Sequence, residues 1–292
     1  MNGKFDETAS GCDPGNIAAD TVPRDGFQAA RVLHLAGTRM DSLGDRVIEE
    51  APIALVYNGV PFAVMMATPC DLQDFALGFA LAEAIVENAS EFELLDVLRS
   101  DRGVTLQGLI PAARFEVLQA RRRSLAGRSG CGLCGIEALE DAVRPLPHVQ
   151  STAHVPRTAI TDGMRALASG QSLNAMTGGA HGAAFIAAGE PPVVREDVGR
   201  HNALDKVIGA LAATRPSRDD LFAHTSRGFA AITSRASWEM LHKAAHAGIA
   251  VVAAISAPTS LAIEAADEAG ITLIAFARDE SMNVYTHAER VT

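Results

Sequence analysis

The chain has 292 residues, 48% of them hydrophobic and 21% charged, a composition that excludes a fibrous or largely disordered protein and predicts about two globular domains. Its 35 acidic and 25 basic residues give a net charge of −10, which disfavours a general role on nucleic acid or on an anionic membrane. The four cysteines are too few for a disulfide framework, and the first residues lack a secretory pattern, so we expect a cytoplasmic protein.

Residues 1–30 are rich in Asp, Gly, Asn, Thr and Pro and predict a flexible leader. The following part, residues 31–150, is expected to form a small N-terminal α+β domain. It opens with a hairpin, because Asn58-Gly59 is a type I′ turn signal between two apolar runs. Asp71 is the expected N-cap of the next helix. The predicted elements are strands at 53–57, 60–66, 92–98 and 104–110 and helices at 72–86 and 112–124.

The stretch 125–135 is glycine-rich and predicts a flexible loop, followed by a helix at 136–143 and a domain boundary near residue 150. The second domain, residues 151–292, alternates strands with helices. Its predicted strands are 183–188, 193–198, 221–225, 249–255 and 271–277, and its predicted helices are 159–169, 200–213, 235–247 and 258–269. This alternation predicts an α/β sheet with helices packed on its faces.

The leading chemical candidate is the pair Cys131 and Cys134 on the glycine-rich loop. A thiolate is a nucleophile and a soft ligand, and glycines let a substrate approach it. Nearby arginines favour the thiolate; they are Arg114, Arg121, Arg122, Arg123 and Arg128. The alternatives are half a zinc site, a redox disulfide as in thiol–disulfide oxidoreductases, or two incidental thiols. No second C-x-x-C completes a zinc site, and Cys12 and Cys70 have no evident role.

The segment from Arg195 to Lys206 places charged groups and His201 at a strand-to-helix junction. The free amides of a helix N-terminus favour an anion, so phosphate binding is one interpretation. The other is that Glu196, Asp197 and Arg200 simply cap the helix and pair with one another. His181, after two glycines, is either a ligand-facing imidazole or a buried structural histidine.

Hydroxyl clusters at 225–226, 233–237 and 256–260 lie near predicted helix starts, where they serve either a ligand or the helix caps. The segment 276–281 follows the last strand, so we expect it at the same sheet edge. The alternative for this segment is a solvated turn.

Taken together, a series of segments closely resembles the FdhD family, the accessory sulfur carriers of formate dehydrogenases. The segments are CGLCG, TGGAHGAA, REDVGRHNALDK, TSRASWEM, ISAPTSLA, FARDES and VYTH. The resemblance runs from about residue 50 to the end of the chain. REDVGRHNALDK is long and specific, whereas CGLCG alone is a weak signal.

The resemblance implies a sulfurtransferase that takes persulfide sulfur from a cysteine desulfurase. It passes this sulfur to the molybdenum (or tungsten) bis(molybdopterin guanine dinucleotide) cofactor before the cofactor enters formate dehydrogenase. Cys131 would carry the persulfide and Cys134 would assist it. The family's cofactor-binding segment falls on Phe276, Ala277, Arg278, Asp279, Glu280 and Ser281, and we expect His181, Arg200, His201 and Arg235 beside it.

The same resemblance implies a homodimer and a C-terminal domain of the cytidine deaminase type, with three α/β/α layers. Deamination is not implied, because we expect residues 151–292 to lack both the H-x-E and the P-C-x-x-C with which deaminases hold zinc and move protons, and no zinc is expected. The alternative function is a chaperone that binds the cofactor without carrying sulfur.

Overall fold

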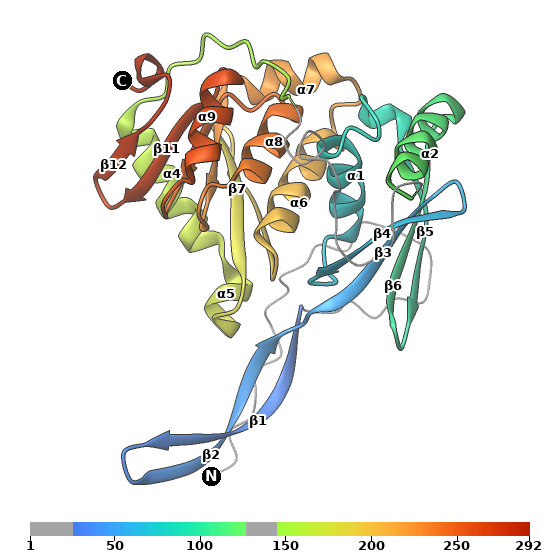
Figure 1. The fold of residues 1–292 in the computed structure, drawn as a ribbon. Helices are drawn as coiled ribbons and strands as arrows, with labels where there is room; N and C mark the ends of the chain where they lie inside the picture. Colours follow the sequence, from blue (N-terminus) through green and yellow to red (C-terminus); the bar gives the residue numbers. More distant parts are fainter. Residues whose placement is uncertain (1–25, 127–144) are drawn as a thin grey trace.

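The computed structural model describes residues 26–126 and 145–292 (Figure 1). Their strands form three sheets: a two-stranded hairpin, a four-stranded sheet of order β4-β3-β6-β5, and a six-stranded sheet of order β12-β11-β10-β9-β7-β8. The mixed α/β class is therefore confirmed. Every helix in this part of the chain is too short or too polar to traverse a lipid bilayer.

The N-terminal unit is built on the four-stranded sheet. Asn58 and Gly59 have φ angles of 50° and 80°, which confirms the type I′ turn of the predicted hairpin. Asp71 is the N-cap of the first helix, as predicted, although its side chain makes no capping hydrogen bond. The elements are β3 (Ala51–Tyr57), β4 (Val60–Ala67), α1 (Leu72–Ala82), η1 (Ala89–Glu91), β5 (Glu93–Ser100), β6 (Gly103–Leu109) and α2 (Ala112–Ala126).

The C-terminal unit is built on the six-stranded sheet, in which β9, β10 and β11 are parallel and β7 runs antiparallel to β9. Helices α6, α8 and α9 pack together on one face, and α4 packs against β7, β9 and β11 (Figure 1). The elements are α4 (Arg157–Gly170), α5 (Ser172–Thr177), β7 (His181–Ala187), β8 (Val193–Asp197), α6 (Arg200–Ala212), α7 (Arg218–Thr225), β9 (Gly228–Ile232), α8 (Trp238–His246), β10 (Val251–Ala254), α9 (Ser260–Glu268), β11 (Thr272–Arg278), β12 (Ser281–Val284) and η2 (Ala288–Arg290).

Several elements differ from the sequence prediction, which did not include α5, β9 or β12. Residues 221–225, expected as a strand, belong to helix α7, because the Ser217 side chain accepts a hydrogen bond from the Asp220 N–H and caps the helix. The described part of the chain also opens with a hairpin of β1 (Phe27–Ala36) and β2 (Arg39–Ile48), so the predicted leader overlaps the first strand. The hairpin projects from the rest of the molecule (Figure 1). The helix expected at 136–143 lies outside the described residues.

The two units are joined by close contact between α1 and α6. A Cβ atom added to Gly78 of α1 would overlap the backbone oxygen of Asp205, and one added to Gly209 of α6 would overlap the backbone oxygen of Asp74. Glycine at these positions lets the helix backbones touch. One hydrophobic cluster accordingly runs through both units. The division into domains near residue 150 stays a prediction.

Candidate functional site

One edge of the six-stranded sheet gathers most of the predicted site segments. The parallel strands β9, β10 and β11 end there, and the antiparallel β7 begins there. The Gly182 N–H donates to Thr233 Oγ1 at 2.8 Å, and the Phe276 N–H donates to the Ser256 carbonyl at 3.2 Å. The segment that follows β9 thus adjoins the start of β7, and the segment that follows β10 adjoins the end of β11. Open α/β sheets bind ligands at such carboxyl edges.

Arg200 and His201 open helix α6 at this edge. Gly199 is the N-cap, and it has no side chain to satisfy the first amides. Arg200 Nε is buried without a hydrogen-bond partner among the described residues, and so is His201 Nε2, which lies 4.0 Å from the Glu239 carboxylate. Burial and then Arg200 lower the pKa of the neighbouring His181, against the influence of Asp197. The helix start therefore offers a guanidinium and two largely neutral imidazoles to a ligand.

We expect the His201 imidazole to stay neutral at mildly acidic pH. Burial, then Arg200 and Lys243, lower its pKa from 6.5 to about 4. An NMR titration should give that midpoint, with His201→Gln assigning the signal. Because an unfolded histidine titrates higher, stability should fall as the pH drops from 6.5 to about 4, and the Gln variant should lose part of this slope. A midpoint at the ordinary histidine value would contradict the burial argument.

The predicted cofactor segment forms the end of β11 and the turn into β12. Phe276 is 39% exposed and has a φ angle of 51°, a left-handed conformation rare for a bulky side chain. The β11–β12 register shifts between Ala275 and Arg278, which makes this a β-bulge. Ala277 is buried, and the Arg278 side chain is held by the Ile255 carbonyl at 2.8 Å. The bulge thus holds the exposed Phe276 ring at the edge, where a flat base can stack on it.

The remaining residues of this edge are exposed. They are Arg235, which precedes α8, and Asp279, Glu280 and Ser281 in the β11–β12 turn. Arg235 makes no side-chain hydrogen bond or ion pair with any other described residue. Its charge is therefore available to an anionic ligand.

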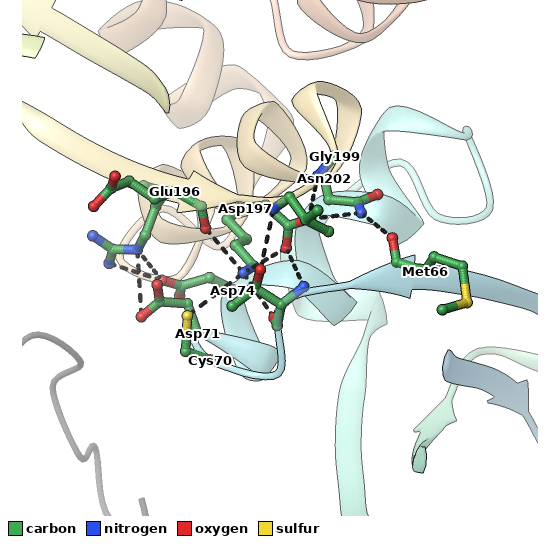
Figure 2. Close-up of polar contacts among 12 residues, drawn as sticks. Met66, Cys70, Asp71, Asp74, Glu196, Asp197, Gly199 and Asn202 are labelled. Carbon is green, nitrogen blue, oxygen red and sulfur yellow. Dashed lines mark hydrogen bonds and ion pairs between the residues drawn. The ribbon is translucent and has the colours of Figure 1, made fainter. Parts of the chain in front are cut away.

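A buried ion pair behind this edge was missed by the sequence interpretation (Figure 2). Lys206 Nζ lies 2.8 Å from Asp197 Oδ2, and both side chains are 0% exposed. Lys206 also donates to the carbonyls of Thr68 and Glu196, each at 3.1 Å. Burial alone would lower the pKa of Lys206, but Cys70 and Asp197 raise it above its ordinary value. Lys206 therefore stays charged.

Asp197 uses its remaining hydrogen bonds to hold two turns together (Figure 2). It accepts from the Gly199 N–H at 2.8 Å and from Asn202 Nδ2 at 2.9 Å in the β8–α6 turn. It also accepts from the Thr68 N–H at 3.0 Å in the turn between β4 and α1. The ion pair thus fixes the residue directly before Arg200 to the N-terminal unit. The sequence signal for this network was the long segment REDVGRHNALDK, which contains more charged and polar residues than the capping of one helix requires.

A second ion cluster extends the same motif toward α8. Lys243 Nζ lies 2.9 Å from Asp205 Oδ1 and 3.0 Å from Glu83 Oε1. Burial raises the pKa of Asp205 to about 7, while Lys243 opposes that shift. These contacts tie α6 and α8 to the end of α1.

Two of the predicted basic groups are neutralised. Arg114 lies 2.8 Å from Glu87 and 3.3 Å from Glu91, so it is not free to act on the cysteines. Arg195 lies 2.8 Å from Asp74 and 3.9 Å from Asp71, so it adds no net positive charge at the edge.

Cys131, Cys134 and Arg128 lie outside the described residues, as do the side chains of Arg121, Arg122 and Arg123. Within the described ranges, no three His, Cys, Asp or Glu side chains are arranged to hold a metal ion. The expectation that residues 151–292 lack an H-x-E is wrong, because His287 and Glu289 form one, with His287 Nδ1 3.6 Å from Glu289 Oε1. These residues contain no cysteine to complete a deaminase zinc site.

Fold and site together define an α/β protein in which one end of the six-stranded sheet is fixed to a second unit by buried ion pairs. The model of the FdhD/NarQ family matches residues 48–292, and the chain belongs to this family. "Sulfur carrier protein FdhD" of Xanthomonas axonopodis pv. citri is 49% identical over 269 residues, which cover 92% of this chain and 93% of that protein. The protein of the same name from Bordetella petrii is 46% identical over 248 residues, 85% and 87% of the two chains.

A solved structure shows the same fold. It is a protein from Desulfotalea psychrophila described as a formate dehydrogenase accessory protein, with a TM-score of 0.68 and 23% identity. The match covers 91% of this chain and 99% of the other, so the shared fold extends over most of this chain.

Proposed function

We propose that this chain is a sulfur carrier that serves formate dehydrogenase. It receives sulfur from a cysteine desulfurase and gives it to the molybdenum bis(molybdopterin guanine dinucleotide) cofactor, which it binds as a substrate. The name and the high coverage of the curated relatives support the carrier role. The observation that carries the substrate assignment is the gathering of Arg200, His201, Arg235 and Phe276 at one sheet edge.

The proposed loading step is a thiol–disulfide type exchange at Cys131. Its thiolate attacks the terminal sulfur of the donor's cysteine persulfide, the donor S–S bond breaks, and the donor cysteine leaves as a thiolate. The product is a Cys131 persulfide, and no external oxidant or reductant is consumed. Cys134 is proposed as its assistant.

The proposed substrate site uses chemistry suited to a guanine nucleotide. Arginine guanidinium groups are planar, permanently charged and well matched to phosphates, and the free amides at the start of α6 also favour an anion. The Phe276 ring offers a surface for a base. Asp279 and Glu280 supply carboxylates that can accept hydrogen bonds from guanine nitrogens. A homodimer remains part of the proposal and is tested by measuring the mass in solution.

Loading can be tested by incubating the protein with a cysteine desulfurase and cysteine and then mapping adducts by peptide mass spectrometry. We expect a mass gain of one sulfur atom on the Cys131 peptide, lost in Cys131→Ala and kept in Cys70→Ala, whose thiol is buried. If the wild-type protein showed no such adduct on Cys131, the proposal that this residue carries sulfur would be excluded.

The rival function is a chaperone that binds the cofactor without carrying sulfur. It would be favoured if Cys131→Ala still activated formate dehydrogenase in cells while Arg200→Ala or His201→Ala did not. Guanosine diphosphate binding by calorimetry separates the two activities, because Cys131→Ala should bind like the wild-type protein and Arg200→Ala should bind more weakly.

A further inference from the structure

A second surface lies at the opposite edge of the six-stranded sheet, where β9 and β11 begin. A hollow of about 720 Å³ is lined there by residues 148–154 together with Ser226, Arg227 and Arg290. The Val149 N–H donates to the Ala269 carbonyl at 2.8 Å, just before β11. Phe276 lies near the other end of that strand, about 15 Å away at the usual rise per residue. The hollow is therefore separate from the proposed nucleotide site.

The backbone along this hollow has the properties of an open strand edge. The N–H groups of Val149 and Val155 point toward the protein and donate to the carbonyls of Ala269 and Arg290. Between them, the backbone groups of Gln150, Thr152 and His154 form no hydrogen bond with any described residue, and all three residues are exposed. In an extended segment, alternate residues direct their backbone groups to the same side. The Ala153 N–H is bonded to Ser151 Oγ at 3.0 Å. The backbone groups of Gln150, Thr152 and His154 thus form a row of donors and acceptors that have no partner among the described residues.

The lining of the hollow is basic although the whole chain is acidic. It contains His148, His154, Arg227 and Arg290 and not a single carboxylate side chain, in a protein of net charge −10. Arg290 is held by the Gly270 carbonyl at 2.6 Å. The side chains of His148, His154 and Arg227 have no hydrogen bond or ion pair within the part of the chain that the structure describes. These three groups are free to contact an acidic ligand.

We propose that residues 150–154 bind an extended acidic segment of a partner protein as an added β-strand. The partner's backbone pairs with the free groups of Gln150, Thr152 and His154, and its carboxylates contact Arg227 and the two histidines. The row of backbone groups favours a peptide over a small anion, which would use Arg227 alone. Because the two edges are separate, the peptide and the nucleotide can bind together.

The test is fluorescence anisotropy with a labelled peptide of alternating Glu and Thr. Arg227→Ser should weaken binding about tenfold or more, since it removes the free cation. Thr152→Pro removes one unpaired N–H without a change of charge and should weaken binding about fivefold, whereas Thr152→Ala should not. Arg165→Ser, at an exposed arginine of α4, is the matched charge control and should bind like the wild-type protein.

Four outcomes would overturn the proposal. A Gln–Thr peptide bound as tightly as the Glu–Thr peptide would exclude recognition of carboxylates. Unchanged binding of a peptide with a methylated backbone would exclude strand addition, even if Thr152→Pro fails to fold. Displacement of the peptide by inorganic phosphate at constant ionic strength would indicate a small-anion site. Added guanosine diphosphate should leave the peptide bound, and competition between them would place the peptide at the nucleotide edge instead.

Discussion

Replacing Lys206 with Met should lower the free energy of unfolding by about 3–5 kcal/mol, the usual cost of breaking a buried ion pair. The substitution leaves the Asp197 carboxylate without its counter-charge in a site that is 0% exposed. It also removes the donor to the carbonyls of Thr68 and Glu196. Urea denaturation followed by circular dichroism measures the change.

The control for this variant is Arg165→Met, which breaks an exposed pair with Asp162 and should cost less than about 1 kcal/mol. Lys206→Met should also weaken guanosine diphosphate binding, because Gly199, held by Asp197, positions Arg200. If Lys206→Met lost less than about 1 kcal/mol of stability, the buried pair would contribute no more than an exposed salt bridge, and the argument from burial would be wrong.

Replacing Gly78 with Ala should destabilise the protein by about 3 kcal/mol or more, the upper range for overpacking a core. In a helix, alanine is normally about 1 kcal/mol more favourable than glycine. Helix propensity alone would therefore predict that Gly78→Ala stabilises the protein, the opposite of the expected result. The reason is that the new Cβ would overlap the backbone oxygen of Asp205 and force α1 away from α6. Denaturation curves measure the effect.

Gly44→Ala is the matched control, because nothing lies within 4 Å of a Cβ at that position of β2. It should change the stability by less than about 0.5 kcal/mol. If Gly78→Ala were as stable as this control, the close approach of α1 and α6 would be wrong.

Local patterns predicted most of the elements. The Asn58-Gly59 turn and the apolar stripe of α1 are short-range signals, and both appear where expected. The alternation of strands and helices also predicted a second sheet, although it placed a strand at 221–225 instead of β9. Such signals succeed because they depend on neighbouring residues alone.

The misses depend on contacts between distant residues or on weak patterns. The partners of Arg114 and Arg195 come from other elements, so their neutralisation was invisible in the sequence. The same is true of Lys206, whose contact with Thr68 spans 138 residues. Hairpin β1–β2 was missed because it is mostly exposed on both faces and lacks clean alternation.

The ion pair of Lys206 and Asp197 also constrains the order in which the protein can fold. Asp197 accepts a hydrogen bond from the Thr68 N–H, 129 residues earlier in the chain. During synthesis, the N-terminal unit leaves the ribosome long before α6 does. The surface of α1 around Gly78 therefore has no helix to pack against until α6 has been made. Closing so long a loop is entropically costly and slow. Neither half is therefore expected to complete its fold alone, and a chain truncated before α6 should be a target for chaperones and proteases.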